Sequence, residues 1–127
     1  MRLSRLRGRK IVDHVLRKGM LWKGKHMSVR FLMGAPRHPH VDQTKGLYTG
    51  LVASTKLDAS AVKRNRMRRR CREAFRITVK NLPDRSPVKL LILPRSSSLT
   101  CTFGELLTDA EKLLQYLPSW QSKTIRQ

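Results

Sequence analysis

VKRNRMRRRCREAF, residues 62–75, is the stretch that decides how this chain folds. Seven of its fourteen residues are Lys or Arg, yet apolar side chains recur among them at the spacing of an α-helix. At 100° per residue, the residues that we expect to face a core are Met67, Cys71, Ala74, Phe75 and Thr78. A segment that needed only charge would have no use for this rhythm. The pattern therefore predicts a folded helix with one buried face.

The other side of this helix gathers its basic residues. The polar residues that point away from the expected core are Asn65, Arg66, Arg68, Arg69, Arg72 and Arg76, with Arg64 at the start of the helix. A guanidinium group is planar, always charged, and presents a fork of donors that matches phosphate oxygens. A solvated face held by ion pairs is the alternative, but Glu73 is the one acidic residue from position 63 to position 76. We therefore expect this face to bind phosphate.

The composition of the whole chain indicates a polyanionic partner. Its 127 residues fit one domain with a modest core, and 28 Lys and Arg against 8 Asp and Glu give a net charge of +20. Nucleic acid suits such a chain because each neutralised phosphate releases counterions. The two cysteines form no C-x-x-C motif, and Cys71 belongs to the apolar rhythm. We expect a buried thiol and a reducing, cytoplasmic setting.

No segment of the sequence has the pattern of a membrane span. The apolar runs fall far short of the roughly 20 residues that a bilayer requires, and no secretory hydrophobic segment is present. The opening MRLSRLRGRK is Arg-rich and free of acid, as in a mitochondrial targeting segment, but it leads straight into a helical pattern. We therefore expect no membrane partner.

One helix and two strands are predicted before the basic helix. Ile11, Val12, Val15 and Leu16 form one apolar stripe, which predicts a helix from Arg9 to Lys18 capped by Gly19. Residues 26–33 alternate like a half-buried strand, and residues 34–46 form a polar, turn-rich loop. Residues 47–54 have the pattern of a second strand, in which Gly50 marks a bulge or a close approach. Ser60 is placed to cap the basic helix, which we expect to run to about Lys80.

One strand and one helix are predicted after the basic helix. VKLLILP, residues 88–94, is almost continuously apolar, as expected of a strand covered on both faces. Thr102 and Glu105 form a capping box for a helix that Pro118 ends. The buried stripe of this helix is predicted to be Leu106, Ala110, Leu113, Leu114 and Leu117. Residues 1–118 are expected to form one compact domain, followed by a short polar tail at 119–127.

The string AVKRNRMRRRCREAFR, residues 61–76, resembles the signature of the bacterial ribonuclease P protein component. In that family, a strand ending in Ser-Lys-Lys precedes Ala-Val-x-Arg-Asn-Arg and further basic residues on one helix. Ser54 and Lys56 match, whereas Thr55 departs, Ala59 replaces a glycine, and the connection is one residue longer. The resemblance implies an α+β fold of the ribosomal protein S5 domain 2-like class. This is a single-domain α/β sandwich whose central, mostly antiparallel sheet carries three helices and a left-handed βαβ crossover.

The resemblance also implies a function. Family members accompany a catalytic RNA that removes the 5′ leader from precursor transfer RNA. Carried over position by position, the residues implied to contact RNA are Lys56, Arg64, Asn65, Arg66, Arg68, Arg69 and Arg72. Arg76 is added because it lies on the same side of the helix.

The resemblance further implies a cleft between the first helix and the sheet that holds the leader. Family members usually carry aromatic residues on that helix, where this chain has Ile11 and Leu16. Aliphatic side chains cannot stack on bases as rings do, so we expect leader contacts that depend on shape and backbone charge. We assign Ile11, His14 and Leu16 to this cleft, although the sequence leaves open whether Ile11 and Leu16 face the cleft or the core.

The sequence offers no catalytic site of its own. Its eight carboxylates form no D-x-D or E-x-x-E cluster able to hold two magnesium ions, and no Ser or Cys lies in a nucleophile motif. His38 and His40 lie in a Pro-rich loop with no acidic or thiol partner nearby. We expect no metal site and no catalytic residue in the protein. The resemblance assigns hydrolysis to the catalytic RNA with its bound Mg²⁺, and it makes this RNA and precursor transfer RNA the partners, with no small-molecule substrate.

Two other classes of protein remain open. A ribosomal protein or an RNA chaperone can use the same basic helix without supporting cleavage. A helix-turn-helix regulator fits less well, because the element before the basic helix is predicted to be a strand rather than a helix.

Overall fold

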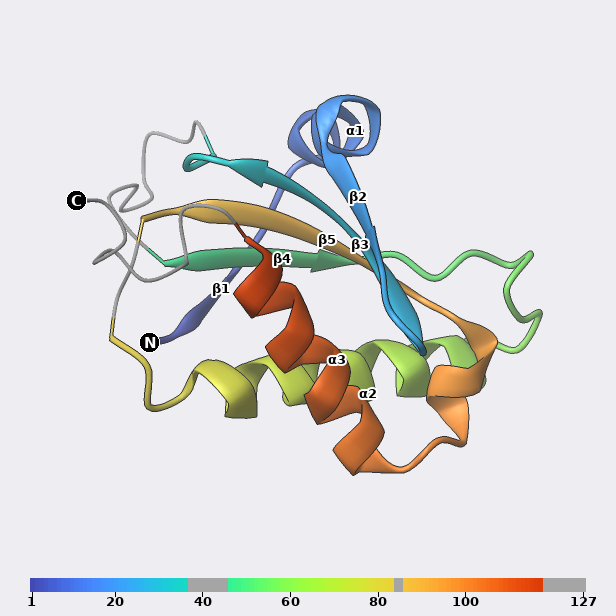
Figure 1. Cartoon of the computed structure of the whole chain (residues 1–127). Helices are drawn as coiled ribbons and strands as arrows, with labels where there is room; N and C mark the ends of the chain where they lie inside the picture. The colour runs from blue at the N-terminus through green and yellow to red at the C-terminus, as the bar shows by residue number, and fades with distance from the viewer. Residues whose placement is uncertain (37–45, 84–85, 118–127) are drawn as a thin grey trace.

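Five strands form one sheet in the computed structural model, which describes residues 1–36, 46–83 and 86–117 (Figure 1). The strand order across the sheet is β1-β4-β5-β3-β2. The strands are β1 (Leu3–Arg5), β2 (Met20–Lys23), β3 (Met27–Met33), β4 (Leu47–Leu51) and β5 (Val88–Pro94). The predicted strands at 26–33, 47–54 and 88–94 are confirmed within a few residues, and most of the predicted loop at 34–46 lies outside the described residues.

The sheet is evenly mixed rather than mostly antiparallel. β3 runs antiparallel to both β2 and β5, whereas β4 runs parallel to both β5 and β1. The second parallel pair arises because β1, which the sequence did not predict, joins the edge beside β4. A helix connects the adjacent parallel strands β4 and β5, as the βαβ expectation required, and the left-handed sense of this crossover stays a prediction.

Three helices cover the two faces of the sheet (Figure 1). α2 (Ala61–Val79) and α3 (Phe103–Tyr116) pack on one face, and α1 (Arg9–Lys18) lies on the other. A short 3₁₀ helix, η1 (Ser96–Leu99), links β5 to α3. Every one of these helices is too short or too polar to cross a membrane, within the part of the chain that the structure describes.

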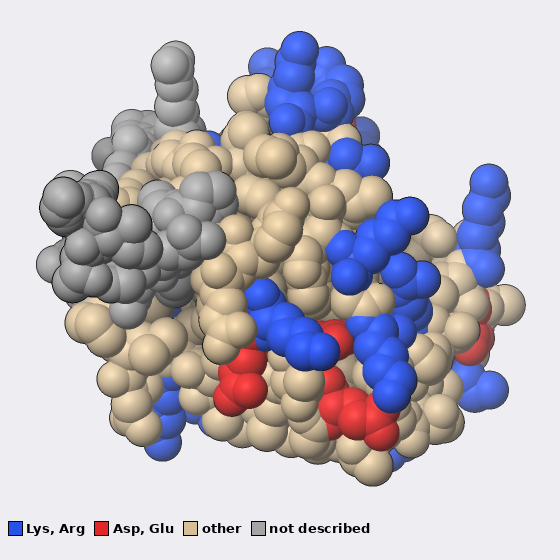
Figure 2. Space-filling model, in the orientation of Figure 1, with Lys and Arg blue, Asp and Glu red and all other residues tan. Residues whose placement is uncertain are grey.

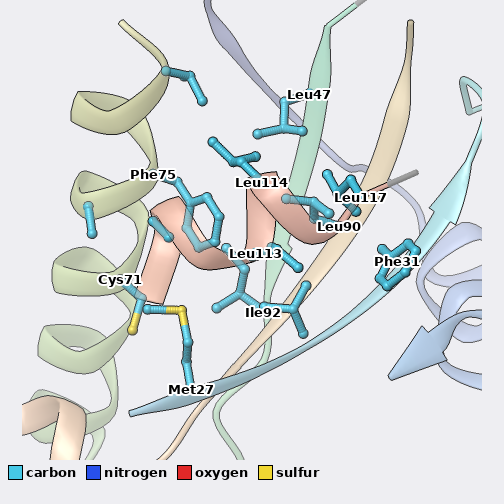
Figure 3. Close-up of a cluster of buried hydrophobic side chains, with 14 of the residues drawn as sticks. Met27, Phe31, Leu47, Cys71, Phe75, Leu90, Ile92, Leu113, Leu114 and Leu117 are labelled. Atoms are coloured by element: carbon cyan, nitrogen blue, oxygen red, sulfur yellow. The ribbon is translucent and has the colours of Figure 1, made fainter. Parts of the chain in front are cut away.

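The main core lies between the sheet and the α2–α3 layer. Figure 3 shows Cys71 and Phe75 of α2 meeting side chains from the strands and from α3, including Ile92 and Leu113. All five of the residues predicted for the stripe of α3 are buried. A smaller core beneath α1 is built from Leu6, Val15, Tyr48 and Leu91.

The predicted orientation of α2 is confirmed. Met67, Cys71, Ala74 and Phe75 are fully buried, and Thr78 is half-buried with its hydroxyl donating to Ala74 O at 2.7 Å. The helix begins where it was expected, because the Ser60 side chain accepts a hydrogen bond from the Lys63 N–H at 3.2 Å. Cys71 is a free thiol, and burial raises its pKa to about 12. The basic face of α2 is thus held in fixed directions by an anchored opposite face.

Close packing explains the two glycines for which the sequence predicted a structural role. A Cβ on Gly50 would lie 3.2 Å from Leu91 Cδ1, and the β4–β5 register continues through this position, so Gly50 marks a close approach rather than a bulge. Gly19 does cap α1, but its φ of −69° is open to any residue. Glycine is required there because a Cβ would lie 2.5 Å from Val15 O.

Candidate nucleic-acid interface

A hollow of about 410 Å³ lies where α2 meets the β1–β4 edge of the sheet. We call it the arginine hollow. Its lining residues come from β1, β4, α2 and the residue after β1, and they are Arg5, Leu6, Thr49, Gly50, Leu51, Asn65, Arg68, Arg69 and Arg72. The sequence had assigned Asn65, Arg68, Arg69 and Arg72 to one binding face, and the structure brings them together.

Hydrogen bonds hold several side chains of the arginine hollow in place. Arg68 donates through Nη1 to Asn65 Oδ1 and through Nη2 to Ala53 O at 3.4 Å. Since the Asn65 oxygen is engaged by Arg68, its NH₂ group remains to donate. Arg72 Nη1 donates to Thr49 Oγ1 at 3.4 Å. The side chains of the hollow therefore offer mainly donors, which suits a ligand rich in acceptor oxygens.

The other predicted contact residues lie outside the arginine hollow. Arg64 donates to Asp58 O at 2.9 Å and Ala59 O at 3.0 Å, so its guanidinium folds back on the loop before α2. Arg76 Nε donates to Glu73 Oε1 at 2.8 Å, which makes the ion pair that the sequence allowed. Arg66 and Lys56 are exposed, the first on the flank of α2 and the second in the loop between β4 and α2. Their RNA-binding roles stay predictions.

One arginine of α2 supports the fold. Arg70 donates to Ser98 O and, at 2.6 Å, to Cys101 O. These bonds join α2 to η1 and to the turn before α3. At about 100° per residue Arg70 lies on a flank of the basic face, but helical phase alone does not show that two backbone carbonyls lie within its reach.

A second hollow lies beside α1, between one side of this helix and the sheet, and we call it the α1 groove. It measures about 670 Å³, and the described residues that line it are Lys10, Ile11, His14, Leu32, Met33, Gly34, Ala35, Pro36 and Lys89. Ile11 and His14 thus lie where a cleft was expected. Ile11 also packs against the small core beneath α1, so it faces both cleft and core.

The assignment of Leu16 to the cleft gains no support from this groove and stays a prediction. Leu16 is 36% exposed and does not line the α1 groove. On a helix it lies about 140° from Ile11, whereas His14 lies only about 60° away. The apolar stripe of α1 is centred on Val15, which is fully buried, and Leu16 falls at its outer edge.

The sequence did not point to Lys10 or Lys89 as groove residues. Lys89 is only 8% exposed, and its Nζ donates to Gly34 O at 3.2 Å and Ala35 O at 3.4 Å. A lysine inside an apolar strand gave a signal, because burial of a charged group requires a local polar partner. The carbonyls of residues 34 and 35 are such partners.

Comparison with known proteins decides the family. A family model described as ribonuclease P matches residues 1–118. The chain belongs to the ribonuclease P protein family. A curated ribonuclease P protein component from Synechococcus sp. (strain RCC307) is 33% identical over 115 residues, which covers 87% of this chain and 89% of that protein. Another, from Synechococcus sp. (strain JA-2-3B'a(2-13)), is 41% identical over 66 residues and covers 52% of this chain and 48% of that protein.

Solved structures agree on the fold. The RNase P protein from Thermotoga maritima is 21% identical with a TM-score of 0.70, and the match covers 91% of this chain and 98% of that chain. The Staphylococcus aureus RNase P protein is 18% identical with a TM-score of 0.67, covering 93% of this chain and 98% of that chain. The α+β sandwich of this ribonuclease P family member is therefore that of its structural neighbours.

The sequence did not predict a polar cluster that lies where the β2–β3 turn meets η1 and α3. His26 is buried, with Nδ1 2.8 Å from Ser97 Oγ and Nε2 2.6 Å from Glu105 Oε1. The N–H groups of Lys25 and His26 donate to the buried carboxylate of Asp109. The N-cap half of the predicted capping box is confirmed, with the Glu105 N–H donating to Thr102 Oγ1 at 3.3 Å. The Glu105 carboxylate accepts from the Thr102 hydroxyl instead of its backbone N–H, and it also holds His26. The cluster ties the β2–β3 turn to α3 in this ribonuclease P family member.

Charge is unevenly distributed over the surface. In Figure 2, Lys and Arg crowd over α1 and beside β2, while the larger acidic patches gather lower in the view, where α3 lies. No three His, Cys, Asp or Glu side chains come together as metal ligands among the described residues, and His38 and His40 lie outside them.

Proposed function

We propose that this chain is the RNA-binding protein subunit of ribonuclease P, and that it assists a catalytic RNA in removing the 5′ leader from precursor transfer RNA. The observation that carries the proposal is the arginine hollow in a member of this family. Four arginines and one asparagine line it, and no Asp or Glu is among its described lining residues. Planar donor groups held on an anchored helix are suited to the phosphates of a folded RNA.

Hydrolysis is assigned to the RNA partner and to the Mg²⁺ ions bound there. In this division of tasks the protein supplies positive charge, which lets two polyanions approach each other. The net charge of +20 supports that role, since RNA affinity grows with each phosphate neutralised. We infer that the protein works in the cytoplasm, where transfer RNA precursors of a bacterial cell are found.

The α1 groove is proposed to receive the leader. Its lining is aliphatic at Ile11 and Leu32, and Lys10, His14 and Lys89 add polar groups to it. Such a lining favours contact by shape and by attraction of the leader backbone, without the stacking that a ring on α1 would add. The expected result is that Lys10→Ala and His14→Ala weaken binding of a precursor with its leader and leave binding of mature transfer RNA unchanged.

Reconstitution tests the proposed function. The purified chain is mixed with a bacterial catalytic RNA and precursor transfer RNA at low Mg²⁺, and cleavage at the mature 5′ end is followed on a gel. We expect cleavage from the mixture and none from the chain alone. Metal-dependent cleavage by the chain alone, free of contaminating RNA, would contradict the assignment of hydrolysis to RNA.

Two controls separate this function from its alternative. Lys112→Ala removes one exposed charge from α3, outside both hollows, and is expected to support cleavage like the wild type. Arg69→Ala removes one from the arginine hollow and is expected to require more protein for the same rate. Tight RNA binding with no restored cleavage would instead favour a ribosomal protein or an RNA chaperone.

A further inference from the structure

Two arginines from distant parts of the sequence meet in the arginine hollow. Arg5 belongs to β1 and pairs in register with Thr49 of β4, so the two side chains lie on the same face of the sheet. Arg72 reaches the same place from α2 and donates to Thr49 Oγ1. Thr49 is 2% exposed and its hydroxyl donates to Ser4 O at 3.4 Å. One buried hydroxyl therefore links the strand of Arg5 to the guanidinium of Arg72.

The electrostatics of this pair favour an anion. Burial, and then the positive charge of Arg5, lower the pKa of Arg72. Two cations facing one hollow repel each other, and no described lining residue is a carboxylate that would offset the repulsion. A bound anion would remove this repulsion, and the guanidinium groups would remain protonated.

The donor pattern of the arginine hollow suits a phosphate. Arg5 and Arg72 carry donors only, and Asn65 presents its NH₂ group because its oxygen accepts from Arg68. A phosphodiester offers two non-bridging oxygens, which share one negative charge and can accept from two guanidinium groups at once. A hollow of about 410 Å³ has room for one such group with its sugars outside.

We propose that Arg5 and Arg72 together hold one backbone phosphate of RNA, with Thr49 as the positioning residue that orients Arg72. This inference rests on the proposed function, because it takes the phosphate from the RNA of that enzyme. The phosphate belongs either to the catalytic RNA or to the precursor, and the test separates the two sources.

A double-mutant cycle tests the shared phosphate. Arg5→Ala and Arg72→Ala are each expected to lower RNA affinity on the order of ten-fold at fixed salt. The double variant is expected to lose little more than either single variant, because both remove the same contact. The slope of log affinity against log salt should become shallower by about one, not two. Additive losses with a slope change of about two would overturn a shared phosphate, and an unchanged affinity in Arg5→Ala would overturn the site.

A pair of substitutions tests whether the Thr49 hydroxyl positions Arg72. Thr49→Val removes the hydroxyl and is expected to reproduce part of the Arg72→Ala loss in RNA affinity, while Thr49→Ser is expected to restore it. Equal affinity of both variants, with any difference confined to melting temperature, would overturn the positioning role. Lys112→Ala controls for the loss of one charge, and circular dichroism with thermal melts confirms that each variant is folded.

Two binding arms identify the source of the phosphate. In the first, each variant is titrated with the catalytic RNA alone; in the second, the assembled enzyme is titrated with precursor transfer RNA. A loss in the first arm assigns the phosphate to the catalytic RNA, and a loss confined to the second assigns it to the precursor. If the wild type restores cleavage and Arg5→Ala has the wild-type RNA affinity in both arms, the shared phosphate site is refuted while the proposed function stands. If the wild type restores no cleavage, the proposed function fails, while the phosphate site still stands or falls by the binding cycle.

Discussion

The two sides of α2 differ in almost every property, although they share the same nineteen residues. One side is fully buried at Met67, Cys71 and Phe75, while the other contributes Asn65 and three arginines to the arginine hollow. The buried side fixes the direction in which the basic side points. The comparison teaches that one helix encodes folding and binding separately, so a variant on one side should leave the other property nearly intact.

The largest expected effect is the loss of RNA affinity as the salt concentration rises. If about six to eight phosphates are neutralised, the slope of log affinity against log salt should lie between about −4 and −7, or a loss on the order of a thousand-fold from 50 to 200 mM salt. The free energy of unfolding of the free protein should fall little or rise, since salt screens the repulsion among its basic residues. Filter binding and denaturant titrations measure the two quantities. A binding slope shallower than about −2 would mean that most of the arginines do not contact phosphate.

Removal of the Phe75 ring tests the buried side. Phe75→Ala is expected to lower the free energy of unfolding by about 3–5 kcal/mol, because it opens a cavity between α2 and the sheet. Arg69→Ala is the matched control on the other side and should change stability by no more than about 0.5 kcal/mol. Denaturant unfolding measures both. If Arg69→Ala unfolded the protein while Phe75→Ala did not, the assignment of the two sides would be wrong.

Arg70 tests whether every basic residue of α2 serves RNA binding rather than stability. Because its guanidinium donates to Ser98 O and Cys101 O, Arg70→Ala is expected to destabilise the fold by about 1.5–3 kcal/mol. Its effect on RNA affinity should be smaller than that of Arg69→Ala. The variant Arg70→Lys keeps the charge but loses the fork, so it should recover only part of the stability. Wild-type stability with an RNA defect as large as that of Arg69→Ala would place Arg70 in the binding face instead.

The smallest effect concerns pH and lies away from both sides of α2. The hydrogen bond from His26 lowers the pKa of Glu105 below its ordinary 4.5. Stability from this bond is therefore present above the unfolded pKa and is lost as pH falls through the lower folded pKa. Thermal melts from about pH 3 to about pH 6 should show a shallower acid decline in Glu105→Gln than in the wild type. Glu111→Gln, on the same helix, should keep the wild-type decline; equal profiles for the two variants would contradict the role of Glu105.

Much of the fold could be predicted because its signals are local. The period of α2, the apolar run of β5 and the Thr102 N-cap of α3 each lie within one short segment, and each is confirmed. β1 and β2 were missed because both are short edge strands with few buried side chains, so no apolar alternation marks them. The hydrogen bonds that create these strands come from partners elsewhere in the chain.

The part of the candidate site that lies on one helix could also be predicted from the sequence. Helical phase was sufficient to group Asn65, Arg69 and Arg72, but it could not reveal Arg5 or Thr49, which reach the arginine hollow through strand pairing. In the α1 groove, an apolar stripe alone did not distinguish Ile11 from Leu16, because the direction of the groove depends on where the sheet lies. Tertiary placement, not residue type, decided these cases.

The pairing of β1 with β4 has a consequence for the order of folding. Residues 3–5 bond to residues 47–49 in a three-residue parallel strand at an edge, so closing this contact orders a long intervening chain for few bonds. We expect β1 to form last and to open first, with fast amide exchange in the free protein. Binding of RNA at Arg5 would then accompany the last step of folding, in which β1 joins the sheet. Hydrogen exchange slowed selectively at residues 3–6 by RNA would show it, and unchanged exchange there would refute it.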